Sequence, residues 1–229
     1  MINVNGLIIS KFNKHTWAHE SALLIQKNIC EILAKRSYCN VFLTGGKTAE
    51  LLYRAWSDLS GFGDISGVNF YFGDERCVPL NDPDSIYGQV MKSLFANGVP
   101  TGINIFEIDC QNNDSNIYSA LKYEALLPRE IDILLLTVGD DGHVASIFPK
   151  SELLVDVGRN VLPVTSPFSP FSRISITPLL IKRANKIYVL GLGKKKSKML
   201  SLALQNRMEI DELPVRLTIN SQSNWLISY

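Results

Sequence analysis

The chain has 229 residues, a formal net charge of +1, 46% hydrophobic residues and 20% charged residues. This length and composition predict a soluble globular protein with a single domain over residues 1–229. The balanced charge argues against nucleic acid or an acidic membrane surface as a partner. No apolar run approaches a membrane span in length, and the N-terminus lacks a signal-peptide pattern.

The four cysteines, Cys30, Cys39, Cys77 and Cys110, are scattered and form no C-x-x-C pair. Disulfide scaffolds and zinc sites need closer spacing, so this pattern favours reduced thiols. The sequence therefore predicts a cytoplasmic protein.

The first elements follow from periodicity. A short strand is predicted over residues 6–12, and apolar residues at helical spacing predict an amphipathic helix over residues 16–36. A similar pattern predicts a helix over residues 115–126, with Ile117 and Leu121 on its apolar face.

Residues 41–53 fit a strand, a glycine loop and a helix, with Gly45 and Gly46 in the loop and Lys47 and Thr48 in the first helical turn. Backbone N–H groups at a helix N-terminus attract anions, and a glycine pair lets a phosphate approach closely. Because glycine pairs are also common in ordinary turns, this segment alone is a weak phosphate signal.

The aromatic stretch 68–72 predicts a buried strand that leads into Asp74, Glu75 and Arg76. Charges at the end of a buried strand favour a position beside a cleft over an ordinary surface turn. Neighbours on a strand point in opposite directions, so Asp74 and Glu75 are not expected to act together on one substrate atom.

Residues 131–138 form an almost purely apolar run, which predicts a strand buried on both faces. The run ends in Gly-Asp-Asp-Gly at 139–142, and His143 follows where open α/β sheets place their ligands. Of the three histidines, His143 is the one best placed for chemistry. On position alone, a structural hydrogen-bonding histidine is the more common case.

A further buried strand over 187–190 leads through Gly193 into a lysine-rich helix start at 194–198. Lysines there oppose the helix dipole, a cost that a bound phosphate would relieve, although a solvated lysine face is an equal alternative.

Three segments complete the chain. The proline-rich stretch 150–172 is predicted to be a long surface connection, and residues 213–219 and 224–228 are predicted to be two closing strands.

Strand–glycine–helix units are predicted at Gly45, Gly139 and Gly193. They imply an α/β fold with a Rossmann-like, mostly parallel sheet covered by helices on both faces. Four residues are expected to share one cleft at the carboxyl edge of the sheet: Thr48, Arg76, His143 and Lys196. One histidine, several cations and an anion-binding turn suit a phosphorylated small molecule and one proton transfer.

The string Asp-Gly-His-x-Ala-Ser-x-Phe-Pro over residues 141–149 resembles the signature of the 6-phosphogluconolactonases, which are related to the glucosamine-6-phosphate deaminases. Five further motifs in the family's order support the resemblance: Gly45-Gly46-x-Thr48, Gly73-Asp74-Glu75-Arg76-Cys77-Val78-Pro79, Arg173-Ile174-Ser175-Ile176-Thr177, Gly193-x-x-Lys196 and Leu213-Pro214-Val215. The chain departs from the family at Lys47, Ala49 and Ile86, where serine, proline and asparagine are usual.

The resemblance implies hydrolysis of 6-phospho-D-glucono-1,5-lactone to 6-phosphogluconate in the oxidative pentose phosphate pathway. In this hypothesis His143 is the general acid/base, Asp141 sets its loop or tautomer, and Asp74 orients groups nearby. The cations Arg76, Arg173 and Lys196 would bind the phosphate or the developing oxyanion. The full predicted set of substrate-binding residues is Gly45, Gly46, Lys47, Thr48, Arg76, Gly142, Arg173 and Lys196.

No metal or other cofactor is expected, because a lactone is already an activated ester. The substrate is the expected partner, with neither nucleic acid nor membrane, and the protein is expected to be a monomer or a small homo-oligomer.

Two alternatives remain. A glucosamine-6-phosphate deaminase-like enzyme is disfavoured because residues 144–149 lack the glutamate of the deaminase sequence and Arg76 replaces its tyrosine. A non-catalytic sugar-phosphate sensor is disfavoured because His143 is retained and the chain has no room for a helix-turn-helix domain.

Overall fold

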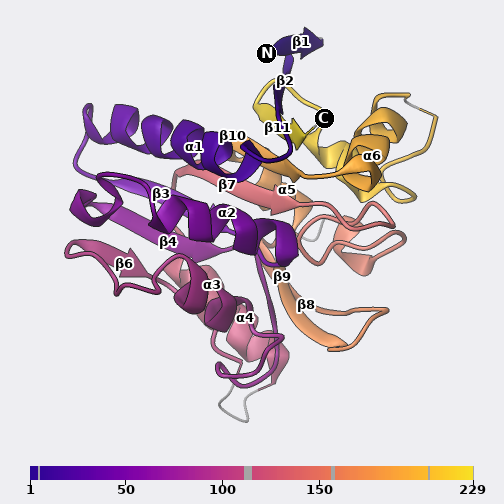
Figure 1. The fold of residues 1–229 in the computed structure, drawn as a ribbon. Helices are drawn as coiled ribbons and strands as arrows, with labels where there is room; N and C mark the ends of the chain where they lie inside the picture. The colour runs from indigo at the N-terminus through magenta and orange to yellow at the C-terminus, as the bar shows by residue number, and fades with distance from the viewer. Residues whose placement is uncertain (5, 111–114, 156–157, 206, 229) are drawn as a thin grey trace.

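A computed structural model describes residues 1–4, 6–110, 115–155, 158–205 and 207–228. Its main sheet has eight strands in the order β1-β2-β11-β10-β7-β3-β4-β6 (Figure 1). All neighbouring strands are parallel except β1 and β2, which confirms the predicted fold class. These strands are β1 (Ile2–Val4), β2 (Leu7–Phe12), β3 (Cys39–Leu43), β4 (Val68–Phe72), β6 (Ile103–Ile105), β7 (Ile131–Thr137), β10 (Ala184–Gly191) and β11 (Ser223–Ser228).

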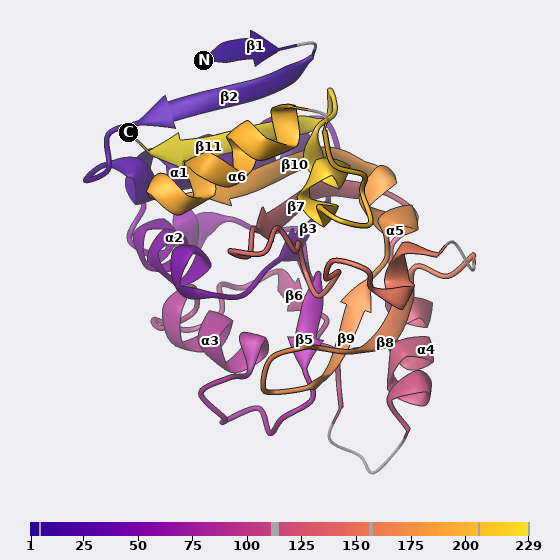
Figure 2. The same cartoon turned by 90° about the vertical axis from the view of Figure 1, so that its right-hand side faces the viewer.

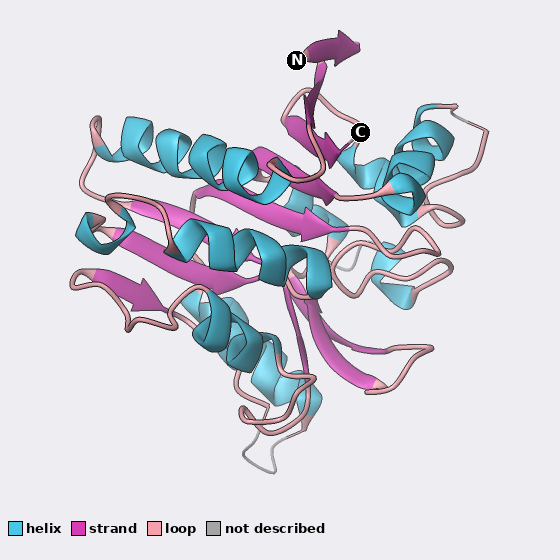
Figure 3. Cartoon of the chain, viewed as in Figure 1, coloured by secondary structure: helices cyan, strands magenta, loops and turns pink. Residues whose placement is uncertain are grey.

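The helices lie on both sides of this sheet. Figure 2 shows α1 and α2 on one side and α5 on the other, and Figure 3 separates helices from strands by colour. The helices are α1 (Trp17–Leu33), α2 (Lys47–Ser57), α3 (Ile86–Ser93), α4 (Asn116–Leu126), α5 (Pro178–Lys182) and α6 (Lys194–Leu204), with 3₁₀ turns η1 (Phe62–Asp64), η2 (Glu152–Leu154) and η3 (Pro214–Thr218). None of the helices in the described ranges is long and apolar enough to cross a membrane.

A second, antiparallel sheet has the order β5-β9-β8, with β5 (Asp74–Arg76), β9 (Ser172–Ile176) and β8 (Val161–Thr165). The prediction of a plain connection over 150–172 was therefore wrong for its second half. Pro163 hides the strand pattern, but an edge strand tolerates proline because one of its sides needs no ladder hydrogen bond.

The helix predicted over 115–126 is confirmed as α4, but its predicted buried face was wrong. Ile117 and Leu121 are 47% and 39% exposed, whereas Ala120 and Tyr123 are buried. The Tyr123 hydroxyl receives the Phe72 N–H at 2.6 Å and donates to the Phe72 carbonyl at 2.9 Å. Burying the Tyr123 ring, with its hydrogen bonds to the Phe72 backbone at the end of β4, therefore stabilises the fold more than burying the aliphatic side chains Ile117 and Leu121 would.

Two further expectations fail at the carboxyl edge. The helix expected directly after Gly139 does not form. Residues 139–150 form tight turns, with isolated bridges between Val138 and Val144 and between Val144 and Ile147. Residues 214–218 form the turn η3 and not a strand, since Pro214 fits the first position of a helical turn and Thr218 Oγ1 donates back to the Val215 carbonyl at 2.7 Å.

The strand order reverses between β3 and β7. The chain runs from β3 to β4 and β6 in one direction and from β7 to β10 and β11 in the other. Thr137, the last residue of β7, spans this reversal by donating to the Gly45 carbonyl at 3.1 Å. Ligands of open α/β sheets bind at such a point, beyond the carboxyl ends of the strands.

The loop after β3 depends on Tyr53, whose hydroxyl receives the Thr44 N–H at 3.0 Å and donates to the Thr44 carbonyl at 2.7 Å. Tyr53→Phe leaves both buried backbone groups unpaired, so we expect a loss of about 1–3 kcal/mol in the free energy of unfolding, measured by urea denaturation. Tyr118→Phe, at a side chain that is 48% exposed, is the control and should stay within about 0.5 kcal/mol of wild type. Equal stability of both variants would contradict the role of this hydroxyl.

Candidate functional site

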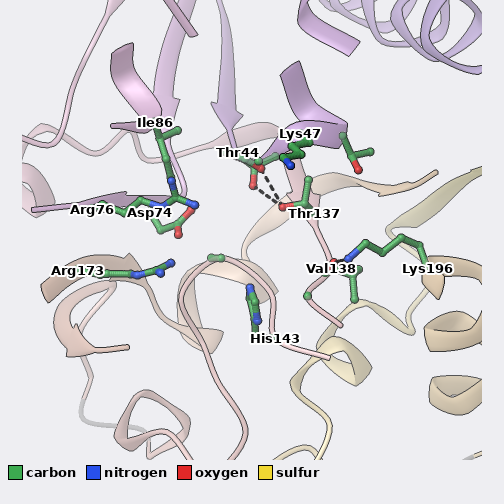
Figure 4. Close-up of a pocket in the computed structure, with 15 residues that line it drawn as sticks. Thr44, Lys47, Asp74, Arg76, Ile86, Thr137, Val138, His143, Arg173 and Lys196 are labelled. Carbon is green, nitrogen blue, oxygen red and sulfur yellow. Dashed lines mark hydrogen bonds between the residues drawn. The ribbon is translucent and has the colours of Figure 1, made fainter. Parts of the chain in front are cut away.

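A cavity of about 290 Å³ opens at the reversal of strand order (Figure 4). Its lining comes from the loops after β3 and β7, from β5, β7 and β9, and from the starts of α2, α3 and α6. The lining residues are Thr44, Gly45, Gly46, Lys47, Thr48, Asp74, Arg76, Ile86, Thr137, Val138, Gly139, His143, Ala145, Arg173 and Lys196. Every residue of the predicted site belongs to this set except Asp141 and Gly142.

The glycine loop after β3 forms one wall. Gly46 has φ +98°, a conformation that glycine adopts without strain, and it immediately precedes α2. The Gln89 side chain of α3 binds both sides of this residue, accepting from the Gly46 N–H at 3.0 Å and donating to its carbonyl at 3.0 Å. The helix N-terminus is thereby held open toward the cavity with Lys47 and Thr48 on its first turn.

Arg76 and Arg173 form another wall, as direct partners in the ladder between β5 and β9. Like charges in such a pair repel each other. The Arg76 Nη1 donates to the Asp84 carbonyl at 2.7 Å, but its buried Nε has no hydrogen-bond partner among the described residues. Burial lowers the pKa of Arg173, which still leaves it a cation. An anion in the cavity would relieve this repulsion.

Asp74 shares this wall, since it lies two residues before Arg76 and on the same face of β5. Its Oδ2 accepts from the buried Ser146 hydroxyl at 2.7 Å. Ser146 is in turn fixed by its N–H, which donates to the Ser175 hydroxyl at 3.1 Å. The carboxylate is thus oriented by a second layer that sequence reasoning did not assign, although Ser146 belongs to the motif after His143.

Glu75 points to the other face of β5, as strand alternation requires. Its carboxylate accepts from the Ile86 and Tyr87 N–H groups, both at 2.7 Å, and so caps the N-terminus of α3. Burial raises the pKa of Glu75 to about 7, against the backbone hydrogen bonds, which lower it. Glu75 is therefore a structural carboxyl group that holds α3 against the cavity wall.

His143 stands at the base of the cavity (Figure 4). The loop closes through the Gly139 N–H, which donates to the His143 carbonyl at 2.9 Å. A side chain at Gly139 would collide with the imidazole, so the ring lies close against the backbone of Gly139. The Phe148 ring, 4.7 Å away between centroids, packs on the imidazole as well.

The imidazole is paired with Asp141, whose Oδ1 lies 2.5 Å from His143 Nδ1. Burial acts to raise the pKa of Asp141, but the hydrogen bond and charge interaction with His143 outweigh it and lower the pKa. An ionised carboxylate accepts the Nδ1 proton, which leaves Nε2 as the nitrogen that can exchange protons with a substrate. Asp141 lies behind the lining, where its carboxylate contacts the histidine rather than the cavity.

Gly142 also lies behind the lining. Its carbonyl accepts from the Val215 N–H at 2.8 Å, and a side chain there would collide with Leu213. Its position assigns it to packing between the His143 loop and η3.

Lys196 reaches the cavity from α6, but its ammonium group is already occupied. It donates to the Val138 carbonyl and lies 3.2 Å from Asp140 Oδ1. Asp140 also binds Lys195, at 2.8 Å, and hydrogen bonds from the two lysines lower the pKa of Asp140. Lys196 therefore fixes the strand end beside His143 while it adds positive charge to one rim.

The departures at Lys47 and Ile86 both fall in the lining, whereas Ala49 is buried in α2. Ile86 packs directly over Gly45, where a side chain would collide with it. Thr44 and Thr137 also line the cavity and were not predicted. Their only sequence signal is a hydroxyl residue at the carboxyl end of a buried strand.

The fold and site define an α/β protein with a cationic cavity and a histidine–aspartate pair, suited to proton transfer on a small anionic molecule. A family model described as glucosamine-6-phosphate isomerases/6-phosphogluconolactonase matches residues 13–227. The chain belongs to this family, as its motifs predicted.

Individual relatives agree with this assignment. The chain is 34% identical to a 6-phosphogluconolactonase of Treponema pallidum over 171 residues, which cover 69% of each chain. It is 29% identical to 6-phosphogluconolactonase 3 of Saccharomyces cerevisiae over 92% of this chain and 90% of the relative. The crystal structure of a 6-phosphogluconolactonase from Thermotoga maritima superposes with a TM-score of 0.84 at 22% identity, covering 97% of this chain and 100% of that one, and one from Shewanella baltica with 0.85 at 21%, covering 97% and 98%.

The Glu75 carboxyl group predicts a pH dependence of stability. Its pKa in the folded state lies above its ordinary value of 4.5, so between about pH 4.5 and 7 the folded protein keeps a proton that the unfolded chain has released. The free energy of unfolding should therefore fall by about 1–3 kcal/mol as the pH rises through this window. Glu75→Gln should remove this slope in denaturation curves recorded across the window. Parallel curves for the two proteins would contradict the raised pKa.

Proposed function

We propose that this protein hydrolyses 6-phospho-D-glucono-1,5-lactone to 6-phosphogluconate, with His143 as general acid/base. The observation that carries the proposal is the His143–Asp141 pair at the base of a cavity with a glycine loop on one wall and two arginines on another. Family membership, and the names of the relatives, support the same substrate class. We also propose that the enzyme works in the cytoplasm, a reducing compartment in which its four free cysteines would be kept as thiols.

The proposed reaction begins with a water molecule between His143 and the lactone carbonyl. The imidazole takes a proton from the water as its oxygen attacks C1, which places a negative charge on the carbonyl oxygen. The tetrahedral intermediate then collapses, the bond from C1 to the ring oxygen breaks, and the imidazolium returns the proton to that ring oxygen. Asp141 stabilises the imidazolium and keeps Nδ1 protonated throughout.

Two negative groups must be accommodated, the 6-phosphate and the transient oxyanion. The structure offers two positively polarised walls, the Arg76–Arg173 pair and the start of α2 with Lys47. A phosphate suits the two guanidinium groups because they bind its oxygens in pairs. The start of α2 then remains for the oxyanion, where backbone N–H groups stabilise charge that develops during the reaction.

The first prediction concerns His143. His143→Ala should lower turnover of freshly generated 6-phosphogluconolactone by about 10²–10⁴-fold above the spontaneous background, because the proton transfer is lost. His15→Ala, at an exposed histidine, is the matched control and should retain wild-type turnover.

Glucosamine 6-phosphate, assayed in parallel, separates the alternatives. Release of ammonia from this amino sugar would replace the lactonase proposal with the deaminase. Binding of 6-phosphogluconate without turnover of either compound would favour the sensor.

A second prediction concerns Asp141. Asp141→Asn exchanges the acceptor at Nδ1 for a group that can donate, which favours the imidazole tautomer with a proton on Nε2 and removes the base. Turnover should fall by about 10²-fold or more with little change in KM. Asp140→Asn removes the neighbouring carboxylate, which contacts only lysines among its described partners, and should leave kcat within a few-fold of wild type. Equal kcat values for the two variants would remove Asp141 from its role.

A further inference from the structure

Outside the cavity, Cys77 and Cys110 bring two thiols together from segments 33 residues apart, with their Sγ atoms 2.9 Å apart. Both thiols are free and partly exposed. Cys77 directly follows β5, and Cys110 lies beyond β6. Two sulfur atoms in direct contact need only a small adjustment of their side chains to form a covalent bond.

The other two cysteines lack this arrangement. Cys30 is free and exposed on α1. Cys39 is buried, and burial raises the pKa of its thiol to about 12, so it stays protonated. The two thiols that touch are therefore also the pair from which a disulfide can form.

We propose that Cys77 and Cys110 are a reversible redox site that closes to an intramolecular disulfide on reaction with a peroxide. In the first step the Cys77 thiolate attacks a peroxide oxygen, the O–O bond breaks, hydroxide leaves and Cys77 becomes a sulfenic acid. In the second step the Cys110 thiol loses its proton and attacks the Cys77 sulfur, the S–O bond breaks and water leaves. Two thiols are oxidised by two electrons and hydrogen peroxide is reduced to two molecules of water.

The surroundings of the pair assign the two roles. The hydrogen bond with the Cys110 thiol lowers the pKa of Cys77 against its partial burial, and the Ser172 hydroxyl lowers it further. The same interaction, together with burial, raises the pKa of Cys110. Cys77 is therefore the thiol that ionises and attacks first, and Cys110 is the one that resolves the sulfenic acid.

The pair lies at the end of the ladder that carries the arginine wall. The Cys77 N–H donates to the Ser172 carbonyl at 3.0 Å, and these two residues follow Arg76 and precede Arg173 in the chain. A disulfide would join this ladder to the segment beyond β6 and close a loop of 33 residues. Closing such a loop removes conformational freedom from the unfolded chain and so stabilises the oxidised protein.

The test uses the full-length protein and does not depend on its activity. Reduced protein is treated with hydrogen peroxide and digested with trypsin without reduction, which separates the cysteines because cleavage after Arg76 and Lys92 places them in different peptides. We expect a cross-linked pair of these peptides that has lost two hydrogen atoms and that dithiothreitol separates. The oxidised protein should also unfold at a temperature several degrees higher than the reduced protein.

Variants provide the controls. Cys30→Ser should behave like wild type, whereas Cys77→Ser and Cys110→Ser should lose both the cross-link and the thermal shift. The proposal is overturned if peroxide converts Cys77 of the wild-type protein to a sulfinic acid, or leaves it unmodified, with no cross-linked peptide.

Discussion

The architecture depends on the burial of β7 on both faces. Ile131 to Leu136 exclude water from above and below the sheet, so helices must cover both sides and only the strand ends remain open. After β3 the chain continues toward β4 at one edge of the sheet, and after β7 it continues toward β10 at the other edge. The loops at the carboxyl ends of β3 and β7 therefore diverge. The cavity is the consequence of this separation, and part of its lining, including Thr44, Gly139 and His143, follows the buried strands β3 and β7.

The electrostatics of the cavity depend more on where its charged side chains lie, and on what they contact, than on how many there are. Arg76 and Arg173 face each other across a ladder, Asp74 lies beside them, and a serine fixes its carboxylate from behind. Lys196 is held by a carbonyl and by Asp140. The positive charge that a bound anion would best compensate therefore lies at the arginine wall, on the side of the cavity away from Lys196 (Figure 4).

Much of this could be predicted from the sequence because its strongest signals are local. The apolar run before Gly139, the glycine loop before α2 and the order of the motifs placed the sheet and most of the cavity lining. The errors arose where tertiary contacts override a local pattern. Tyr123 determines which face of α4 is buried, because its hydroxyl forms hydrogen bonds with the backbone of β4. The strand β8 pairs in a second sheet, and its sequence shows no alternating pattern that would predict a strand.

The short helix α3 carries a further consequence. Its N-terminus is bound by Glu75 on the back of the arginine wall, and Gln89, about one turn later, forms two hydrogen bonds with Gly46 in the glycine loop. One turn of helix, about 5.4 Å long, thus acts as a spacer whose length is set by backbone hydrogen bonds. The spacing between the arginine wall and the glycine loop is therefore tied to the geometry of α3, which contacts both of them.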